Sequence, residues 1–292
     1  MNSSYRNTIF VEDAEILQHT GYEGDQYLIR LRAPKTAEHA QPGNFVHLQC
    51  DDLLPMRRPM SLMRVKPKTG EIEILYKRHG HGTTLLSQRN VGETLSVMGP
   101  IGRPFKLENY HRYPLLIGGG VGLPPMVYLA EHMKNLRGEI SPFVILGSEV
   151  PFPFPLKPSQ IIIEGIPNGV IATMPLLEDW GVACRLASLQ DYPGCFEGYV
   201  TDLARSWLET MEPHQRSEVE IFSCGPTPML KAVKMLAEEY GLPCQVSLEE
   251  YMACAVGGCA GCVVRLETET GPKMKRVCVD GPIFEAKTVV FQ

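Results

Sequence analysis

The sequence predicts three structural parts in order: a β-barrel over residues 1–108, an α/β domain with a parallel sheet over residues 109–245, and a small metal-cluster module over residues 246–292. Short strand patterns with regular turn residues predict the barrel. A switch to strands that alternate with helices predicts the parallel sheet. Four cysteines at ligand spacing near the C-terminus predict the cluster.

The barrel is expected from five strand patterns. They cover residues 9–17, 26–31, 44–49, 72–76 and 94–98. Turn segments that contain glycine or proline separate these strands, and one helical stretch over residues 83–88 interrupts them. Short strands joined by regular turns are typical of a closed barrel.

The middle domain is expected from apolar runs that alternate with helical patterns. We expect strands at 114–117, 142–146 and 218–222, and helices at 125–136 and 227–240. Strands separated by helices in this way form a parallel sheet. Proline at every second position of residues 151–155 excludes regular structure there, so we expect a loop.

The composition is that of a soluble globular protein, with 44% hydrophobic and 21% charged residues. A net charge of -5 gives no basic face for nucleic acid or anionic lipid, so neither is an expected partner. The N-terminal residues lack the apolar core of a signal peptide, and glycines and prolines break the longest apolar stretch, residues 114–130. We therefore expect a cytoplasmic protein outside the membrane, with nine cysteines that do not form a disulfide framework.

The most specific motif is a run of three cysteines, Cys254, Cys259 and Cys262, followed by Cys278. The C-x4-C-x2-C spacing is the plant-type spacing of a [2Fe–2S] cluster. Glycines within the run allow backbone N–H groups to approach the sulfur atoms. The alternative is a structural zinc ion on the same four cysteines. The module is too small for much of a core, so the metal site is expected to stabilise it.

Two segments of the barrel suggest a bound dinucleotide. The first is Arg-Pro-Met-Ser at residues 58–61, where a guanidinium can grip a pyrophosphate and a serine hydroxyl can reach a ring nitrogen. The second is a Gly-Thr step, Gly82 and Thr83, which opens a short helix and can bind phosphate through backbone N–H groups. Each segment alone is also compatible with ordinary surface structure.

Two further motifs lie where a strand ends and a helix begins in the middle domain. One is the glycine-rich turn of residues 118–122, whose spacing departs from G-x-G-x-x-G because Leu123 stands at the last glycine position. The other is Cys-Gly-Pro at residues 224–226, whose Cys224 could approach a nicotinamide ring. Both lie at the ligand-binding edge of a parallel sheet. The alternatives are a glycine turn without a ligand and a buried thiol in a tight turn.

Taken in order, these motifs resemble the ferredoxin–NADP reductase superfamily. The C-terminal cysteine module narrows the resemblance to the electron-transfer subunits of type B, NAD-dependent dihydroorotate dehydrogenases. The resemblance covers nearly all 292 residues. It is weakest over residues 148–195, where Pro-Phe-Pro-Phe-Pro stands in place of a charged segment and residues 188–193 replace an acidic-glycine turn.

The resemblance implies FAD on the barrel, NAD(H) on the middle domain and a [2Fe–2S] cluster on the four cysteines. Implied FAD contacts are Arg58, Pro59, Met60, Ser61, Leu75, Tyr76, Lys77, Gly82 and Thr83. Implied NAD(H) contacts are Gly118, Gly119, Gly120, Gly122, Cys224, Gly225 and Pro226. Ser61 and Cys224 would lie nearest to the reacting rings, as the catalytic positions.

The resemblance also implies a partner, an FMN-containing catalytic subunit that oxidises dihydroorotate in pyrimidine (UMP) biosynthesis, in a heterotetramer with two copies of each chain. Electrons would then pass between this partner and NAD+. Two alternatives stay open. One is a related diaphorase subunit that serves a ferredoxin- or sulfide-linked partner. The other is a sensor that binds a cluster but catalyses nothing.

Overall fold

The computed structural model describes residues 8–107, 111–136 and 140–291, and its chain forms two compact units. The first unit contains residues 1–105 and 248–283, and the second contains residues 106–247 and 284–292. The unit boundaries at 105 and 247 lie close to the expected domain boundaries. The cysteine-rich segment groups with the first unit, so the division into three domains stays a prediction.

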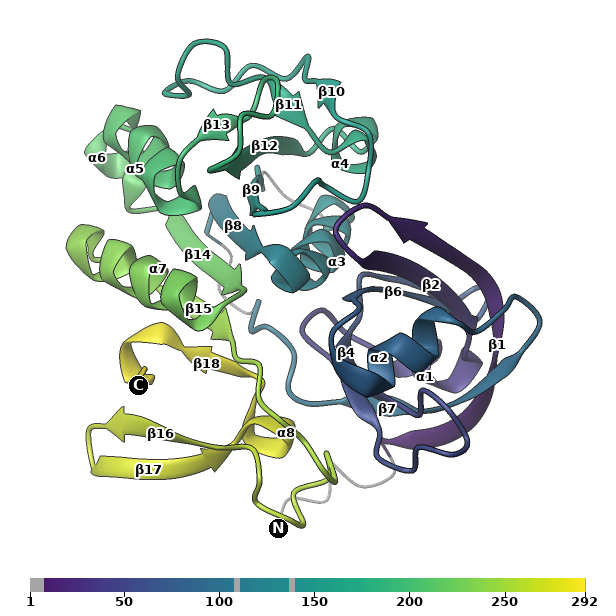
Figure 1. Cartoon of the computed structure of the whole chain (residues 1–292). Coiled ribbons are helices and arrows are strands. Elements are labelled where there is room, and N and C mark those ends of the chain that lie inside the picture. The colour runs from purple at the N-terminus through teal and green to yellow at the C-terminus, as the bar shows by residue number, and fades with distance from the viewer. Residues whose placement is uncertain (1–7, 108–110, 137–139, 292) are drawn as a thin grey trace. The chain divides into compact units, whose positions relative to one another are not determined.

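The first unit is built on a seven-stranded sheet with the order β4-β3-β7-β1-β2-β6-β5 (Figure 1). Its strands are β1 (Phe10–Tyr22), β2 (Gln26–Arg32), β3 (Phe45–Leu48), β4 (Arg58–Ser61), β5 (Arg64–Lys66), β6 (Glu71–Lys77) and β7 (Thr94–Ile101). All ladders in this sheet are antiparallel. Helices α1 (Pro34–His39) and α2 (Gly80–Ser87) join β2 to β3 and β6 to β7.

The sheet is a half-barrel. Within the described ranges, no ladder joins the outer strands β4 and β5, so the closure expected from the sequence is absent there. The composition of β4 accounts for this edge, because Pro59 has no N–H to donate to a further ladder. The short strand β5 spans only Arg64–Lys66. The predicted class of the domain is confirmed, and only its closure differs.

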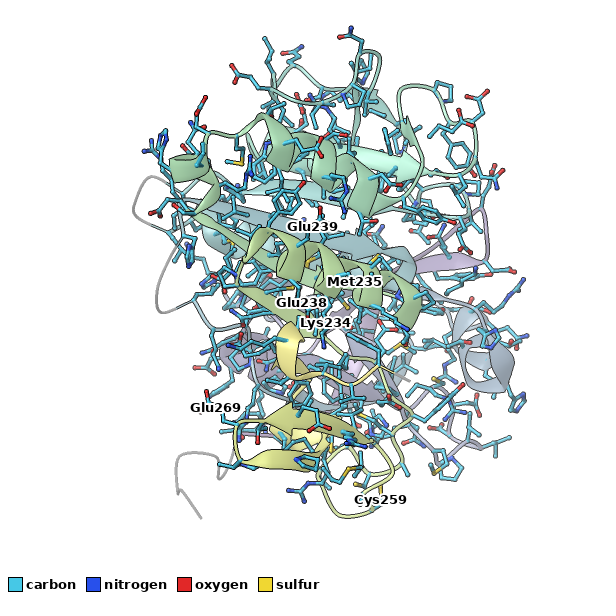
Figure 2. The ribbon with its side chains drawn as sticks, turned by 90° about the vertical axis from the view of Figure 1, so that its left-hand side faces the viewer. Lys234, Met235, Glu238, Glu239, Cys259 and Glu269 are labelled. Atoms are coloured by element: carbon cyan, nitrogen blue, oxygen red, sulfur yellow. The ribbon has the colours of Figure 1, made fainter. Side chains whose placement is uncertain are left out.

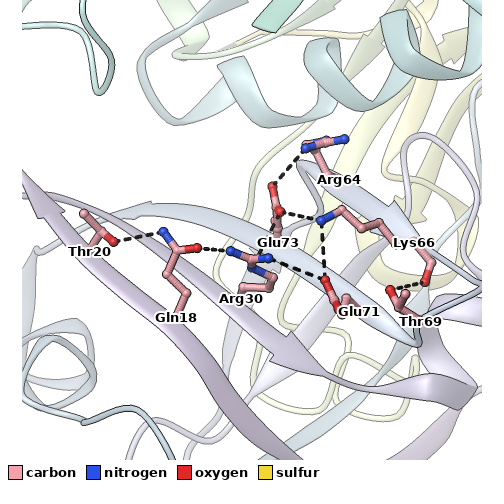
Figure 3. Close-up of polar contacts among 8 residues, drawn as sticks. All are labelled: Gln18, Thr20, Arg30, Arg64, Lys66, Thr69, Glu71 and Glu73. Carbon is pink, nitrogen blue, oxygen red and sulfur yellow. Dashed lines mark hydrogen bonds and ion pairs between the residues drawn. The ribbon is translucent and has the colours of Figure 1, made fainter.

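The two faces of the sheet differ in chemistry. Ile29, Leu31, Ile72 and Ile74 alternate along β2 and β6 and are fully buried on one face. On the other face, Arg30 lies 3.7 Å from Glu71 and 3.8 Å from Glu73, and Lys66 and Arg64 also approach these carboxylates (Figure 3). Side-chain hydrogen bonds continue the network from Arg30 to Gln18 and Thr20.

The second unit contains a seven-stranded sheet with the order β13-β12-β9-β8-β14-β15-β18. The strands are β8 (Tyr113–Gly119), β9 (Phe143–Gly147), β12 (Ala183–Ser188), β13 (Phe196–Glu197), β14 (Val219–Cys224), β15 (Cys244–Ser247) and β18 (Ile283–Glu285). The ladders from β13 through β15 are parallel, as the alternation of strands and helices predicted. Strand order therefore reverses at β8, which lies between β9 and β14.

Helices cover this sheet. They are α3 (Leu123–Lys134), α4 (Pro175–Asp179), α5 (Val200–Thr210), α6 (Pro213–Arg216) and α7 (Thr227–Tyr240), with 3-10 turns at η2 (Gly120–Gly122) and η3 (Ala286–Thr288). Helix α3 packs against β8, β9 and β14, whereas α5 packs against β9, β12 and α7. Helix α7 has the predicted bounds and ends at Gly241, whose φ of +65° is the left-handed conformation that favours glycine. None of the described helices is long and apolar enough to span a membrane.

The least predictable part of this unit is the segment between β9 and α5. Residues 151–155 form a loop, as their prolines indicated. A two-stranded ribbon follows, made of β10 (Lys157–Pro158) and β11 (Ala172–Thr173). Strand β12 was not predicted, although five of its six residues are buried and it lies inside the sheet.

The cysteine-rich segment of the first unit begins with a loop that carries the first three cysteines. A hairpin of β16 (Val263–Thr268) and β17 (Gly271–Arg276) follows, and then the short helix α8 (Val277–Asp280). The N–H of Val277 donates to the carbonyl of Cys262 at 2.9 Å. The hairpin therefore returns the chain from Cys262 to Cys278.

Candidate cofactor-binding sites

The loop that carries the first three cysteines directs backbone N–H groups at sulfur atoms. Gly258 and Cys259 donate to Cys254 Sγ at 3.2 and 3.3 Å, and Gly261 donates to Cys259 Sγ at 3.4 Å. Such bonds favour the thiolate form, which is the form that binds metal. The loop thus has the donor arrangement expected around an iron–sulfur cluster.

Left-handed backbone conformations give this loop its tight course. Ala255 and Ala260 have φ of 54° and 55°, and Gly257 has φ of 80°. Positive φ is uncommon for a residue other than glycine, asparagine or aspartate. Arg276, at the end of β17, donates to the Gly257 carbonyl at 2.9 Å and also bonds Asp280. These bonds join the cysteine loop to α8, which carries the fourth cysteine.

The four cysteine side chains lie as two pairs. Burial disfavours the charged form of Cys254, but hydrogen bonds from the backbone of Cys259, Val256 and Gly258 outweigh it and lower its pKa to about 6. Cys278 differs, because burial and then the neighbouring Cys262 side chain raise its pKa to about 12. Across the described ranges, no three Cys, His, Asp or Glu side chains converge as ligands of a single metal ion would. Four cysteines are the number of ligands that a [2Fe–2S] cluster takes.

The loop lies at the surface. Cys259 is exposed, Cys254 is half-buried, and Cys262 and Cys278 are buried. Figure 2 shows Cys259 on the loop beside the β16–β17 hairpin. A cluster on these cysteines would therefore have one side open to an electron-transfer partner.

The expected flavin motif places a guanidinium beside the start of α2. A Cβ atom built on Gly82 would lie 2.8 Å from Nε of Arg58, so the glycine leaves room for that guanidinium. Arg58 also donates to the Met56 carbonyl at 2.8 Å. Within α2, Thr83 Oγ1 accepts from the N–H of His79 at 2.7 Å. A cation next to helical N–H groups is an arrangement that binds phosphate.

The remaining expected flavin contacts lie on β4 and β6. Pro59, Met60 and Ser61 follow Arg58 along β4, and Ser61 pairs with Phe45 of β3. Lys77 is exposed at the end of β6, and Leu75, two residues earlier in the strand, is buried. Alternation along β6 places Leu75 and Lys77 on one face of the sheet and Tyr76 on the other.

Tyr76 points into the buried face. Its hydroxyl is 2.8 Å from His19 Nε2, and its ring stacks on Tyr27 with centroids 5.4 Å apart. The other ring nitrogen of His19 is 2.8 Å from the Arg89 carbonyl. This side chain is therefore engaged inside the half-barrel, which leaves the Tyr76 backbone as the group that could line a cofactor.

The two glycine motifs of the second unit meet at the point where the strand order reverses. Gly118 at the end of β8 pairs with Cys224 at the end of β14. A Cβ atom on Gly122 would lie 2.1 Å from the Cys224 carbonyl oxygen and 2.5 Å from the nitrogen of Gly225. Ligands of open parallel sheets bind at this place, where the carboxyl ends of the strands diverge. The side chain of Cys224 is fully buried there, and its approach to nicotinamide stays a prediction.

Met229 is a residue of this site that the sequence did not reveal as such. A Cβ atom on Gly119 would lie 2.4 Å from the Met229 sulfur, and one on Gly225 would lie 2.5 Å from its methyl carbon. The thioether thus lies between the two glycine motifs, against Gly119 on one side and Gly225 on the other. The helical period of residues 227–240 places Met229 on one face with Val233 and Leu236, but it does not tell which neighbours the first turn meets.

The comparisons with known proteins agree with this geometry. Residues 249–290 match the iron–sulfur cluster binding domain of dihydroorotate dehydrogenase B. A solved structure from work on flavin-based electron bifurcation by the NADH-dependent reduced ferredoxin–NADP oxidoreductase superposes with a TM-score of 0.76 and 25% identity, over 95% of this chain and 90% of that one. The ferredoxin reductase of carbazole 1,9a-dioxygenase shares the fold, with a TM-score of 0.62 over 80% of this chain and 67% of that one, at 23% identity.

Two curated relatives are similar over most of their length. The dihydroorotate dehydrogenase B (NAD+) electron transfer subunit of Desulforamulus reducens is 31% identical over 97% of this chain and 99% of its own. The corresponding subunit of Geobacillus thermodenitrificans is 35% identical over 90% of this chain and 92% of its own. The chain belongs to the family of dihydroorotate dehydrogenase B electron transfer subunits.

Proposed function

We propose that this chain transfers electrons between NAD(H) and a catalytic partner, as a flavin- and iron–sulfur-dependent oxidoreductase subunit. The observation that carries the proposal is the cysteine loop, in which backbone N–H groups bond the sulfur atoms of Cys254 and Cys259. The same chain carries, at the switch point of its parallel sheet, the glycine turns that suit a dinucleotide. A cluster ligand set and a nucleotide fold in one chain support electron transfer rather than sensing alone.

Three groups of residues would hold the cofactors. Cys254, Cys259, Cys262 and Cys278 would ligate a [2Fe–2S] cluster. The strand Arg58–Ser61 and the first turn of α2, which includes Gly82 and Thr83, would hold FAD. Arg58 and the N–H groups of this turn up to Gly82 can bind its pyrophosphate. The turn Gly118–Gly122 and residues Cys224–Pro226 would hold NAD(H) through backbone groups. When bound, FAD exchanges hydride with nicotinamide and single electrons with a cluster.

The proposed partner is an FMN-containing subunit that oxidises dihydroorotate to orotate, in a heterotetramer of two copies of each chain. The family name of the relatives, electron transfer subunit, supports a separate catalytic partner. The role of this chain's residues is then to bind NAD(H) on the second unit, to bind the flavin on the first unit, and to present the cluster to the partner. Pyrimidine biosynthesis is the process that this activity would serve.

Two measurements test the proposal. Protein purified without oxygen should contain iron, acid-labile sulfide and FAD, and should reduce an artificial electron acceptor with NADH. Zinc in place of iron would defeat the cluster assignment, and a lack of turnover with iron and FAD present would favour a sensor. Affinity capture from the native cell should then retrieve a flavoprotein that oxidises dihydroorotate.

A second candidate is a diaphorase subunit with another partner. It is favoured by the similarity over 95% of this chain to the structure from the NADH-dependent reduced ferredoxin–NADP oxidoreductase work. Reduction of ferredoxin by NADH, together with capture of a partner that does not oxidise dihydroorotate, would support this candidate over the first.

A further inference from the structure

His47 is a buried polar side chain whose ring nitrogens lack hydrogen bonds. It lies on β3 and is 1% exposed. Within the described ranges, neither Nδ1 nor Nε2 of this residue has a hydrogen-bond partner. Buried polar groups are nearly always paired, and an unpaired one costs free energy. A partner that engages the ring in the working protein is therefore expected.

The position of His47 links it to the expected flavin strand. In the ladder between β3 and β4, His47 lies opposite Pro59, inside the Arg58–Ser61 strand. The backbone carbonyl of His47 accepts from Arg57 Nη1 at 3.3 Å, and the same nitrogen donates to the Ser96 carbonyl at 2.7 Å. The chain that leads into β4 is thus held firmly against the neighbouring strands.

The side chain of His47 lies on the face of β3 that the cysteine-rich segment covers. Phe45, two residues earlier in the strand, projects from the same face. A Cβ atom on Gly102 would lie 3.2 Å from Phe45 Cε1 and 2.5 Å from Pro282 Cδ, so Phe45 and Pro282 meet there. Val46 projects from the opposite face and meets Gly99 of β7 instead.

The surroundings of the ring identify two carbonyl groups as possible partners. Burial, and then the positive charge of Arg57, lower the pKa of His47 to about 4, so the ring is neutral at physiological pH. The backbone groups of Met252 and Arg57 act in the opposite direction and raise this pKa, which is the effect of a carbonyl oxygen close to a ring N–H. The chain just before the cysteine loop runs along this face, since the N–H of Leu248 donates to the Pro282 carbonyl at 3.0 Å and Pro282 meets Phe45. The carbonyls of Arg57, before β4, and of Met252, before Cys254, are therefore the candidate partners of the ring.

We propose that His47 is a positioning residue that donates its ring N–H to the Met252 carbonyl and so holds the cysteine loop in place beside strand β4. A neutral imidazole has one N–H and can bind one of the two carbonyls. Arg57 is already fixed by its bonds to Ser96 and to the His47 backbone. Met252 gains more from the bond, because it precedes an exposed loop. This inference rests on the proposed cluster at the four cysteines.

The consequence concerns the cluster and not the flavin. Partners of metal ligands that lie outside the coordination sphere set the orientation of the ligands, and their loss typically costs 10–100-fold in metal affinity. Met252 is two residues before Cys254, so a loosened Met252 allows that cysteine to move. The Arg58 guanidinium beside Gly82 does not depend on the imidazole.

The test compares His47→Phe with His47→Gln in the full chain loaded with iron and flavin. Phenylalanine keeps the ring volume but cannot donate, whereas glutamine can donate one amide N–H to a carbonyl. His39, exposed on α1, supplies the control His39→Phe. The measurements are the rate at which a chelator removes iron, the electron paramagnetic resonance spectrum of the reduced protein, and the flavin content.

We expect His47→Phe to lose iron about tenfold faster, with a broadened resonance spectrum and unchanged flavin. His47→Gln and His39→Phe should behave like the unmodified chain. Equal rates of iron loss in His47→Phe and the unmodified chain, or loss of flavin with retained iron, would overturn the proposal. If His47→Phe does not fold, the rates of iron loss are compared between His47→Met, which cannot donate, and His47→Gln, which can. Equal rates of iron loss in these two variants would overturn the proposal. An unmodified chain without iron would instead defeat the proposed function.

Discussion

The carbonyl oxygen of Cys224 occupies the space that any side chain at Gly122 would need, since a Cβ atom there would lie 2.1 Å from it. The two glycine motifs of the second unit therefore touch directly through their backbones at this point. Real Cβ atoms do not approach other atoms so closely, so a larger residue must push the turns apart. This close contact between Gly122 and the Cys224 backbone joins the ends of β8 and β14 into one site.

Gly122→Ala should weaken NADH binding at least about tenfold, or about 1.4 kcal/mol. The methyl group has to displace the Cys224 backbone, which carries the second half of the proposed nucleotide site. Titration of the flavin absorbance with NADH under anaerobic conditions measures the affinity. Met235→Ala is the control, because Met235 is 62% exposed on α7 of the same unit (Figure 2). Unchanged affinity in Gly122→Ala would remove the turn from the NADH site.

Arg58→Lys should lower the affinity for FAD by about 10- to 100-fold. A hydrogen bond to a charged group contributes about 1.5–3 kcal/mol, and an ammonium cannot reproduce the forked donors of the guanidinium. FAD content after gel filtration and the flavin dissociation constant measure the effect. Arg32→Lys is the matched control, since Arg32 forms an exposed ion pair with Glu15 at 3.4 Å. Full FAD occupancy at low flavin concentration in Arg58→Lys would place the pyrophosphate elsewhere.

The sequence predicted the features that depend on neighbours in the chain. The strands at 26–31 and 72–76 correspond to β2 and β6 with shifts of one residue at the ends, and the helix at 227–240 corresponds to α7 without a shift. Their apolar periods and flanking turn residues act locally. The metal-site motif could also be predicted from local sequence, because one short loop supplies three of its four cysteine sulfur atoms.

The features that the sequence did not predict depend on contacts between distant segments. Strand β12 carries Arg185, whose buried guanidinium bonds the carbonyls of Cys184, Val170 and Ile161, and a charge in a strand obscures the buried pattern. The inward side chain of Tyr76 follows from the register with β2. The neighbours of Met229 and His47 come from segments far away in the sequence. The periodicity of the local sequence therefore cannot predict these contacts.

Glu220→Gln should stabilise the second unit at neutral pH. Burial raises the pKa of the Glu220 carboxyl above its ordinary value of 4.5, against the opposing effect of the bond from Gln245 Nε2 at 2.8 Å. A raised folded-state pKa means that the stability contribution of this group is complete below pH 4.5 and is lost as pH rises through the folded value. A glutamine at this position keeps an oxygen that can accept the hydrogen bond from Gln245, and its side chain stays uncharged as pH rises.

Urea unfolding at pH 4 and pH 7 tests this expectation. Both tryptophans of the chain, Trp180 and Trp207, belong to the second unit, so their fluorescence reports its unfolding. The midpoint of Glu220→Gln should exceed that of the unmodified chain at pH 7, and the two should coincide at pH 4. Glu209→Gln, at an exposed position of α5, should leave the urea midpoint unchanged at both pH values. A larger advantage at pH 4 than at pH 7 would contradict the assigned direction of the pKa shift.

Cys278→Ser should abolish the cluster and leave FAD bound. Cys278 lies on α8, is 1% exposed and pairs with Cys262, so a serine there removes one thiolate of a pair and puts a hydroxyl in its place. The expected flavin contacts lie on β4, β6 and α2, which are separate elements. Iron analysis and visible absorbance should therefore show a yellow protein without the brown contribution of a cluster.

The control for this experiment is Cys195→Ser, a half-buried cysteine of the second unit outside the motif. It should keep iron, flavin and NADH-dependent reduction of an artificial acceptor. In Cys278→Ser that reaction should persist when the acceptor takes electrons from the flavin. Transfer to the catalytic partner should stop, because the proposed route to the partner runs through the cluster. Iron retained at the level of the unmodified chain would show that three cysteines suffice. Undiminished transfer to the partner after loss of iron would show that electrons leave this chain by a route other than the cysteine loop.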